Sequence, residues 1–122
     1  MFSLTSQLCF HVYAHPTDMR KSIDGLCGIV RGSLRKDPVS SEDVYVFTNK
    51  QRNKVKLLHW ESGGFVLYYK RLESGTLDWP FSGSDTLAQQ LSYTRLLLLL
   101  EGVTIKTFLQ RKRYKKPSET LG

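Results

Sequence analysis

Four cations with no acid among them lie between positions 50 and 56 of the sequence: Lys50, Arg52, Lys54 and Lys56. They separate two apolar runs and would stand at the tip of a two-stranded ribbon. Such a ribbon fits the major groove of DNA, and cations on its turn can neutralise phosphates. The alternative is a solvated hairpin end. Because four like charges repel each other without an anion, the pattern favours binding.

A second pair of cations, Arg20 and Lys21, follows Asp18 at the expected start of a helix. Cations in the first turn oppose the helix dipole, which costs about 0.3–1 kcal/mol. This placement indicates a contact elsewhere, either with a phosphate or with an acid such as Asp24 or Glu73. The two interpretations are equally supported by the sequence.

Two further groups of cations stand later in the chain. Lys70 and Arg71 end an expected strand, so their side chains point to opposite faces and at most one joins a single basic surface. The group near the C-terminus suits either an arm that clamps phosphate or a disordered solubilising tail, and it comprises Arg111, Lys112, Arg113, Lys115 and Lys116.

Catalytic and metal chemistry find little support in the sequence. Three histidines lack ligand spacing with the cysteines, so we expect no zinc site: His11, His15 and His59. A magnesium-dependent nuclease gathers two or three carboxylates, and the spacing of the candidates does not align them: Asp18, Asp24, Glu73 and Asp78. We therefore expect no enzyme activity and no cofactor.

The composition indicates one folded domain with a polyanionic partner. The 122 residues are 40% hydrophobic and carry a net charge of +7, which fits nucleic acid first and an anionic membrane second. We expect a single domain over 1–110 and a basic tail over 111–122. Cys9 and Cys27 read as buried thiols of a reducing compartment, with a disulfide as the alternative. The leucine run 96–100 is too short to cross a bilayer, so we expect a cytoplasmic protein.

The elements that must position the cations follow from periodicity and turn residues. The expected fold class is α+β, an antiparallel β-meander of about four to five strands packed against an N-terminal helix and a C-terminal leucine-rich helix. The pattern predicts strands over 10–14, 44–47, 55–60, 65–72 and 77–79, helices over 18–34 and 93–101, and a helical turn over 87–91.

The second helix carries five consecutive leucines, which give it apolar surface on nearly every side. It must therefore be buried on two sides or be covered in part by a partner chain. The two tryptophans, Trp60 and Trp79, are expected in the core or in cross-strand pairs; stacking on bases is the less favoured interpretation.

Three ordered blocks resemble one protein family. They are 18–21 with 23–26, then 46–47, 49–50, 52–56 and Trp60, and finally 70–73, Gly75 and 79–80. Together they resemble the Orf2-like accessory protein, called TnpB, of the insertion-sequence 66 family of bacterial transposable elements. This family is distinct from the RNA-guided nuclease that shares the name TnpB.

The resemblance implies a small protein encoded beside a larger transposase and needed for efficient transposition. With the charge layout, it leads us to expect a non-catalytic accessory protein that binds DNA at the element ends through a basic face. The expected partners are DNA and the transposase of the same element. A homo-oligomer is a further option, and no membrane partner is expected. The alternative is an adaptor that docks on the transposase, or on itself, through the leucine-rich helix.

Overall fold

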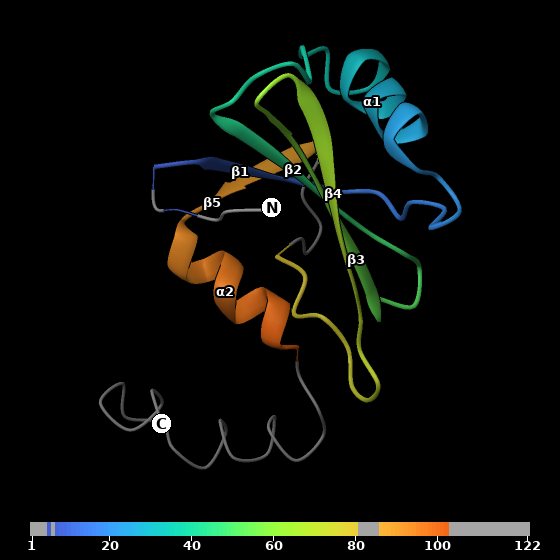
Figure 1. Cartoon of the computed structure of the whole chain (residues 1–122). Helices are drawn as coiled ribbons and strands as arrows, with labels where there is room; N and C mark the ends of the chain where they lie inside the picture. The colour runs from blue at the N-terminus through green and yellow to red at the C-terminus, as the bar shows by residue number, and fades with distance from the viewer. Residues whose placement is uncertain (1–4, 6, 81–85, 103–122) are drawn as a thin grey trace.

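A five-stranded sheet lies between two helices in the computed structural model, which describes residues 5, 7–80 and 86–102 (Figure 1). The elements in chain order are β1 (Cys9–Tyr13), α1 (Ile23–Gly32), β2 (Asp43–Thr48), β3 (Lys54–Glu61), β4 (Gly64–Arg71), β5 (Ala88–Leu91) and α2 (Tyr93–Glu101). The two helices pack against opposite faces of the sheet. The α+β class expected from the sequence is confirmed.

The sheet is mixed, with the strand order β4-β3-β2-β1-β5. Strands β2, β3 and β4 form the antiparallel meander that the short turns predict. The prediction of a meander throughout is wrong, because β1 pairs parallel with β2 and antiparallel with β5. The chain between β1 and β2 is long enough to cross over through α1, as a parallel pair requires.

The central strand β2 is buried on both faces, as its continuous apolar run predicts. One cluster joins Val44 and Val46 to Leu96 and Leu99 of α2. The other joins Tyr45, Phe47 and Leu58 to the α1 side chains, which are Leu26, Cys27 and Val30. Both cysteines are free thiols, and Cys9 is half-buried although the sequence suggested a buried position.

Two short segments differ from the prediction. Residues 77–79 form no strand; Leu77 and Trp79 are nevertheless buried, and the Trp79 indole Nε1 donates to the Tyr13 carbonyl at 3.3 Å. Residues 88–91 form strand β5 where a helical turn was predicted. The open edge of β1 offers backbone partners there, and this tertiary pairing overrides the helical propensity of alanine and glutamine.

The first helix begins later than its predicted start at Asp18. Residues 18–21 form a turn in which the Lys21 amide donates to the Asp18 carbonyl at 3.0 Å, and α1 is preceded by Ser22. The second helix matches its predicted bounds. Its cap residue Ser92 accepts a hydrogen bond from the Arg95 amide, and Gly102 ends the helix with a φ of 81°.

The leucine run of α2 is divided between core and surface. Leu96, Leu99 and Leu100 are buried, whereas Leu97 and Leu98 are 43% and 45% exposed. In the described part of the chain, α2 is therefore buried on the side of Leu96, Leu99 and Leu100. The side with Leu97 and Leu98, for which the sequence predicted burial or cover by a partner chain, is partly exposed. Predictions on 103–122, including the basic tail, fall on residues outside the described ones.

Candidate nucleic-acid interface

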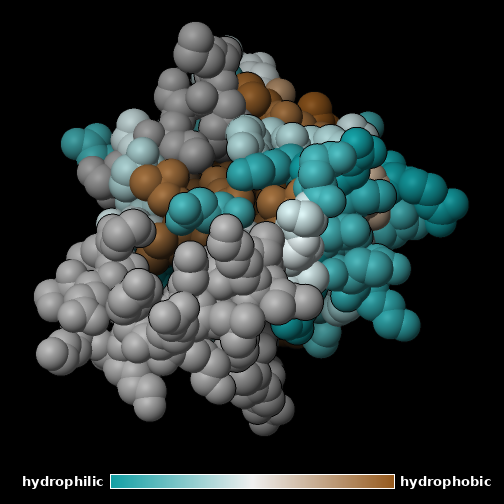
Figure 2. Space-filling model, turned by 90° about the horizontal axis from the view of Figure 1, so that it is seen from below, coloured by the Kyte–Doolittle hydropathy of each residue, from teal (hydrophilic) through white to brown (hydrophobic). Residues whose placement is uncertain are grey.

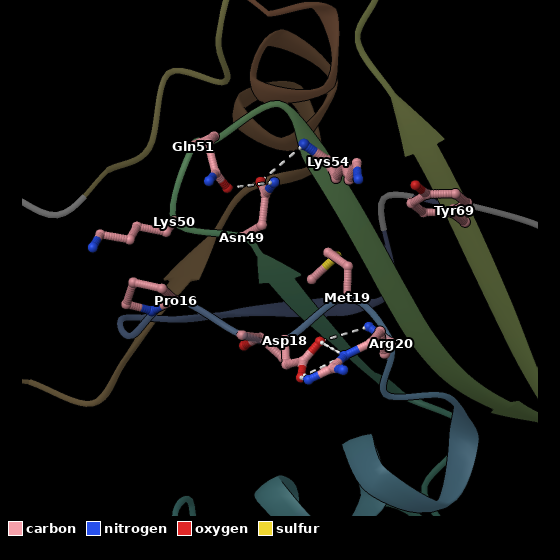
Figure 3. A pocket seen from close by; sticks show the side chains of 10 residues that line it. Pro16, Asp18, Met19, Arg20, Asn49, Lys50, Gln51, Lys54 and Tyr69 are labelled. Atoms are coloured by element: carbon pink, nitrogen blue, oxygen red, sulfur yellow. Dashed lines mark hydrogen bonds and ion pairs between the residues drawn. The ribbon is translucent and has the colours of Figure 1, made fainter.

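An open groove of about 520 Å³ lies where three separate segments of the chain meet. Its walls are residues 16–20 before α1, residues 49–51 with Lys54 at the β2–β3 turn, and Tyr69 of β4 (Figure 3). Residues of the first two sequence blocks quoted above, 18–20 and 49–50 with Lys54, therefore line the same groove. Three of the predicted site residues, Arg20, Lys50 and Lys54, contribute to it.

Arg20 forms an ion pair with Asp18 on one wall of the groove. Its Nη2 donates to Oδ2 at 2.8 Å, and its Nε lies 3.1 Å from both carboxylate oxygens. Asp18 Oδ1 also accepts the Arg20 backbone amide at 2.9 Å, so the carboxylate fixes both backbone and side chain. The hydrogen bond from Arg20 is the main reason that the pKa of Asp18 falls to about 2.

This arrangement corrects the interpretation of Arg20 and Lys21 as cations in the first helical turn. Both precede the helix, so neither occupies its first turn. The acid that pairs with Arg20 is Asp18, which the sequence suggested as a cap, and the proposed partners Asp24 and Glu73 are not involved. The ion pair is exposed and open to exchange with another anion.

Lys56 fastens the 16–22 segment to the sheet. Its Nζ donates to the carbonyl oxygens of Met19 and Lys21, both at 2.8 Å, and lies 5.3 Å from the centre of the Tyr69 ring. Tyr69 stands directly opposite Lys56 on the neighbouring strand. Two of the three ammonium hydrogens are therefore used in hydrogen bonds to backbone carbonyls. The main role of Lys56 is thus to position the wall of the groove that carries Arg20.

Asn49 shapes the opposite wall. Its Oδ1 accepts the backbone amides of Asn53 and Lys54, both at 3.1 Å. Its Nδ2 donates to Gln51 Oε1 at 3.2 Å and to Asn53 Oδ1 at 2.6 Å. These four bonds use the full capacity of the amide, which closes the turn and presents Lys50 and Lys54 from a fixed backbone.

The last strand pair adds a further cation beside the groove. Lys54 and Arg71 are direct cross-strand partners, so two like charges share one sheet face, an unfavourable pairing without an anion. The Arg71 Nε donates to Glu73 at 3.0 Å in an exposed pair. Lys70 points to the other face, where its Nζ donates to the Leu100 carbonyl at 2.7 Å. The prediction that Lys70 and Arg71 serve different faces is confirmed.

The remaining predicted site residues have distinct positions. Arg52 is exposed in the β2–β3 turn with a φ of 57°. Lys21 is exposed and its aliphatic stem lies over Gly25, where an added Cβ would come within 3.1 Å of it. Seen from below, the end of the molecule with the β2–β3 turn and the segment after β4 is hydrophilic (Figure 2). The tail cations lie outside the described residues.

Sequence reasoning missed Tyr69, which is 50% exposed beside the cations. A signal was present: Tyr69 stands two residues before Arg71, so strand alternation puts both on one face. The register that sets Tyr69 opposite Lys56 depends on the two-residue turn at 62–63. The position of this turn therefore predicts a strand register in which the Tyr69 ring lies beside the cations of the site.

Histidines and acids form separate pairs away from the groove. His11 Nε2 lies 2.7 Å from Asp43 Oδ1, and His59 Nδ1 lies 3.1 Å from Glu61 Oε2. Within 5, 7–80 and 86–102, no three histidine, cysteine or acidic side chains are grouped so that they could hold a metal ion. In the same part of the chain, no helix has the length and apolar character needed to span a bilayer.

Comparison with known proteins links this chain to one family. The family model described as IS66 Orf2 like protein matches residues 9–115, which include the whole groove. A protein of Sinorhizobium fredii (strain NBRC 101917 / NGR234), y4jC, described as uncharacterized, is 31% identical over 108 residues. That match covers 88% of this chain and 89% of the relative. No solved structure matches the chain.

Proposed function

Because the chain belongs to the family of IS66 Orf2-like proteins, we propose that it is a non-catalytic accessory protein of DNA transposition. The family match confirms the resemblance inferred from the three sequence blocks and fits an accessory role in transposition. In our proposal the protein works in the bacterial cytoplasm beside a separate transposase. It binds DNA at the element ends through the basic face around the groove.

The observation that carries this proposal is the meeting of Arg20 with Lys50 and Lys54 at one groove. These cations come from segments far apart in the sequence, so their proximity is a product of folding. Arg71 stands opposite Lys54 on the same face and adds a further cation, which is paired with Glu73. A phosphate backbone would neutralise this concentration of charge, and release of its counterions would drive binding.

The proposed mode of action is positioning without bond cleavage. Lysine and arginine donate hydrogen bonds to phosphate oxygens and fix the register of a protein on DNA. The two arginines near the groove are held by Asp18 and Glu73, whose carboxylates a phosphate would replace. In this way the protein would hold a DNA segment in place for the transposase.

The test is binding of labelled duplex DNA at several salt concentrations. We expect the logarithm of the affinity to fall linearly with the logarithm of the salt concentration, with a slope of about −0.9 for each phosphate contacted. Affinity that does not fall with salt, or no affinity at all, would remove the phosphate-contact mechanism.

A matched set of charge variants assigns that binding to the groove. Lys50→Gln and Lys54→Gln each remove one cation at the groove, and each should make the salt slope shallower by about 0.9. The control is Arg95→Gln, which removes an exposed cation from α2 on the other side of the sheet. Equal losses for all three variants would point to a general charge effect and not to this face.

A second candidate function is a protein–protein adaptor that docks on the transposase through α2. It is favoured by Leu97 and Leu98, which are nearly half exposed on that helix. Capture of the transposase of the same element by the intact protein, lost on Leu97→Glu and Leu98→Glu with DNA binding retained, would support the adaptor. A change of molecular mass in the same variants would instead identify self-association.

A further inference from the structure

We propose that the groove accepts unpaired nucleotides, with a base stacked on the Tyr69 ring and the adjoining phosphates on Lys50 and Lys54. This inference rests on the proposed function, because it names the form of nucleic acid that the same basic face takes. It adds one structural requirement that phosphate contacts alone do not impose. The ligand must present the flat face of a base, which a continuous duplex keeps inside its stack.

Tyr69 has the exposure and support that a stacking platform needs. The side chain is 50% exposed although it stands on a strand of the sheet, and it lines the groove. The Lys56 ammonium lies 5.3 Å from the centre of its ring, and the same ammonium is anchored by two backbone carbonyls. The ring is thereby associated with a fixed cation, an arrangement that orients an aromatic side chain. Base–aromatic stacking tolerates any base because every base has a π face.

The hydrogen-bonding groups of the groove are arranged for charge and not for base edges. Asn49, the amide most able to recognise a base, already makes four hydrogen bonds within its turn. Gln51 Oε1 accepts one of them. The cationic groups that line the groove are the ammonium groups of Lys50 and Lys54, together with Arg20 once it exchanges Asp18 for a phosphate. Charge combined with an aromatic ring is the pattern of sequence-tolerant single-strand binding.

The dimensions of the groove agree with a ligand of this class. Its volume of about 520 Å³ lies within the ~300–1,000 Å³ typical of sites for small organic ligands. Figure 3 shows Lys54 and Tyr69 on neighbouring strands, with the Lys50 side chain extending away from Tyr69. A strand of nucleic acid that stacks on the ring can therefore continue along the turn toward Lys50. The groove thus combines an aromatic surface on which a base can stack with cations along the path of the bound strand.

The decisive experiment compares three labelled probes of equal length: a single-stranded oligothymidylate, the same strand with abasic sites, and a blunt duplex. Wild-type protein should bind the oligothymidylate at least about fivefold more tightly than Tyr69→Leu does, since stacking contributes that factor or more for each base. Tyr69→Phe keeps the ring and should bind as wild type does. The abasic strand and the duplex should bind Tyr69→Leu and wild type equally.

The outcomes separate this inference from the function on which it rests. If Tyr69→Leu binds oligothymidylate as tightly as wild type while duplex binding keeps its salt dependence, the stacking proposal is overturned and phosphate binding stands. Equal loss on the abasic strand and on oligothymidylate would also overturn it, because no base is then involved. If wild type binds none of the probes at any salt concentration, the proposed function fails as well. Thermal unfolding of each variant confirms that the fold is intact.

Discussion

The Nζ atom of Lys56 donates a 2.8 Å hydrogen bond to the carbonyl oxygen of Met19, so an ammonium on a sheet strand holds the segment that carries Arg20. The same atom donates to the Lys21 carbonyl at 2.8 Å. A cation that reads from the sequence as a phosphate ligand thus has a structural task. Its removal should affect stability and binding together, whereas a purely surface cation should affect binding alone.

Replacing Lys56 with methionine keeps most of the aliphatic stem and removes both hydrogen bonds. We expect the free energy of unfolding to fall by roughly 1–3 kcal/mol, because two backbone carbonyls lose their donor. Urea denaturation measures this change through its midpoint. Lys50→Met is the control, since Lys50 is exposed in the turn and its loss should change stability by less than about 0.5 kcal/mol. Equal midpoints for the two variants would show that Lys56 does not anchor the segment.

Substitutions of the neighbouring β4 residues Lys70 and Arg71 should separate effects on folding stability from effects on DNA binding. Lys70 donates to the Leu100 carbonyl at the end of α2, where helix carbonyls lack partners, so Lys70→Met should cost about 1 kcal/mol of stability. Its DNA affinity should not change. Arg71→Met removes an exposed ion pair and should change stability by less than about 0.5 kcal/mol, but it should weaken DNA binding. The opposite assignment of effects would place the DNA on the α2 face of the sheet.

Stability at alkaline pH should depend on Tyr45. Burial, with Asp43 and Asp37 nearby, raises the pKa of Tyr45 to about 12 from its ordinary value of 10. The folded protein therefore keeps the proton that the unfolded chain loses, so this contribution is complete below pH 10 and is lost as the pH rises toward 12. The loss should be on the order of 2 kcal/mol. Denaturant unfolding of Tyr45→Phe should show a correspondingly smaller fall over that window, and identical pH profiles would contradict it.

The Asp18–Arg20 ion pair should compete with DNA. The pKa of Asp18 is about 2, so its carboxylate stays charged at any ordinary assay pH. Asp18→Asn retains an oxygen that can accept the Arg20 amide but removes the charge that occupies the guanidinium. We expect tighter duplex binding with a salt slope steeper by about 0.9, as one more cation becomes available to phosphate. Weaker binding would mean that the ion pair orients Arg20 for the ligand.

Much of the local structure could be predicted from the sequence, because turns and capping residues are local signals. The hairpins between β2 and β4 follow from turn residues at 49–53 and 61–64, and Ser92 with Gly102 marks both ends of α2. The parallel pairing of β1 with β2 is marked by no turn residue; its signal is the order of strand, helix and strand over 10–14, 18–34 and 44–47, which the prediction of a meander throughout did not use. The edge strand β5 was missed because its partner is remote in sequence.

The sequence predicted most of the cations of the site, but it did not predict how they are arranged or which groups they contact. Alternation along β4 correctly divides Lys70 from Arg71, because it depends on strand geometry alone. The pairing of Arg20 with Asp18 arises because 18–21 is a turn, whereas the apolar periodicity favours a helix there. The use of Lys56 as an anchor depends on the path of the chain before α1, which tertiary packing decides.

Because the groove takes its walls from the segment after β1, the β2–β3 turn and Tyr69 near the end of β4, no fragment that lacks one of these can form it. An isolated β2–β4 hairpin unit would retain most of the cations and yet lack the wall with Arg20. A ligand that needs the complete groove binds the native chain and not the denatured one. Such a ligand must raise the melting temperature as its concentration exceeds the dissociation constant, so thermal shift can find it in a mixed set of oligonucleotides.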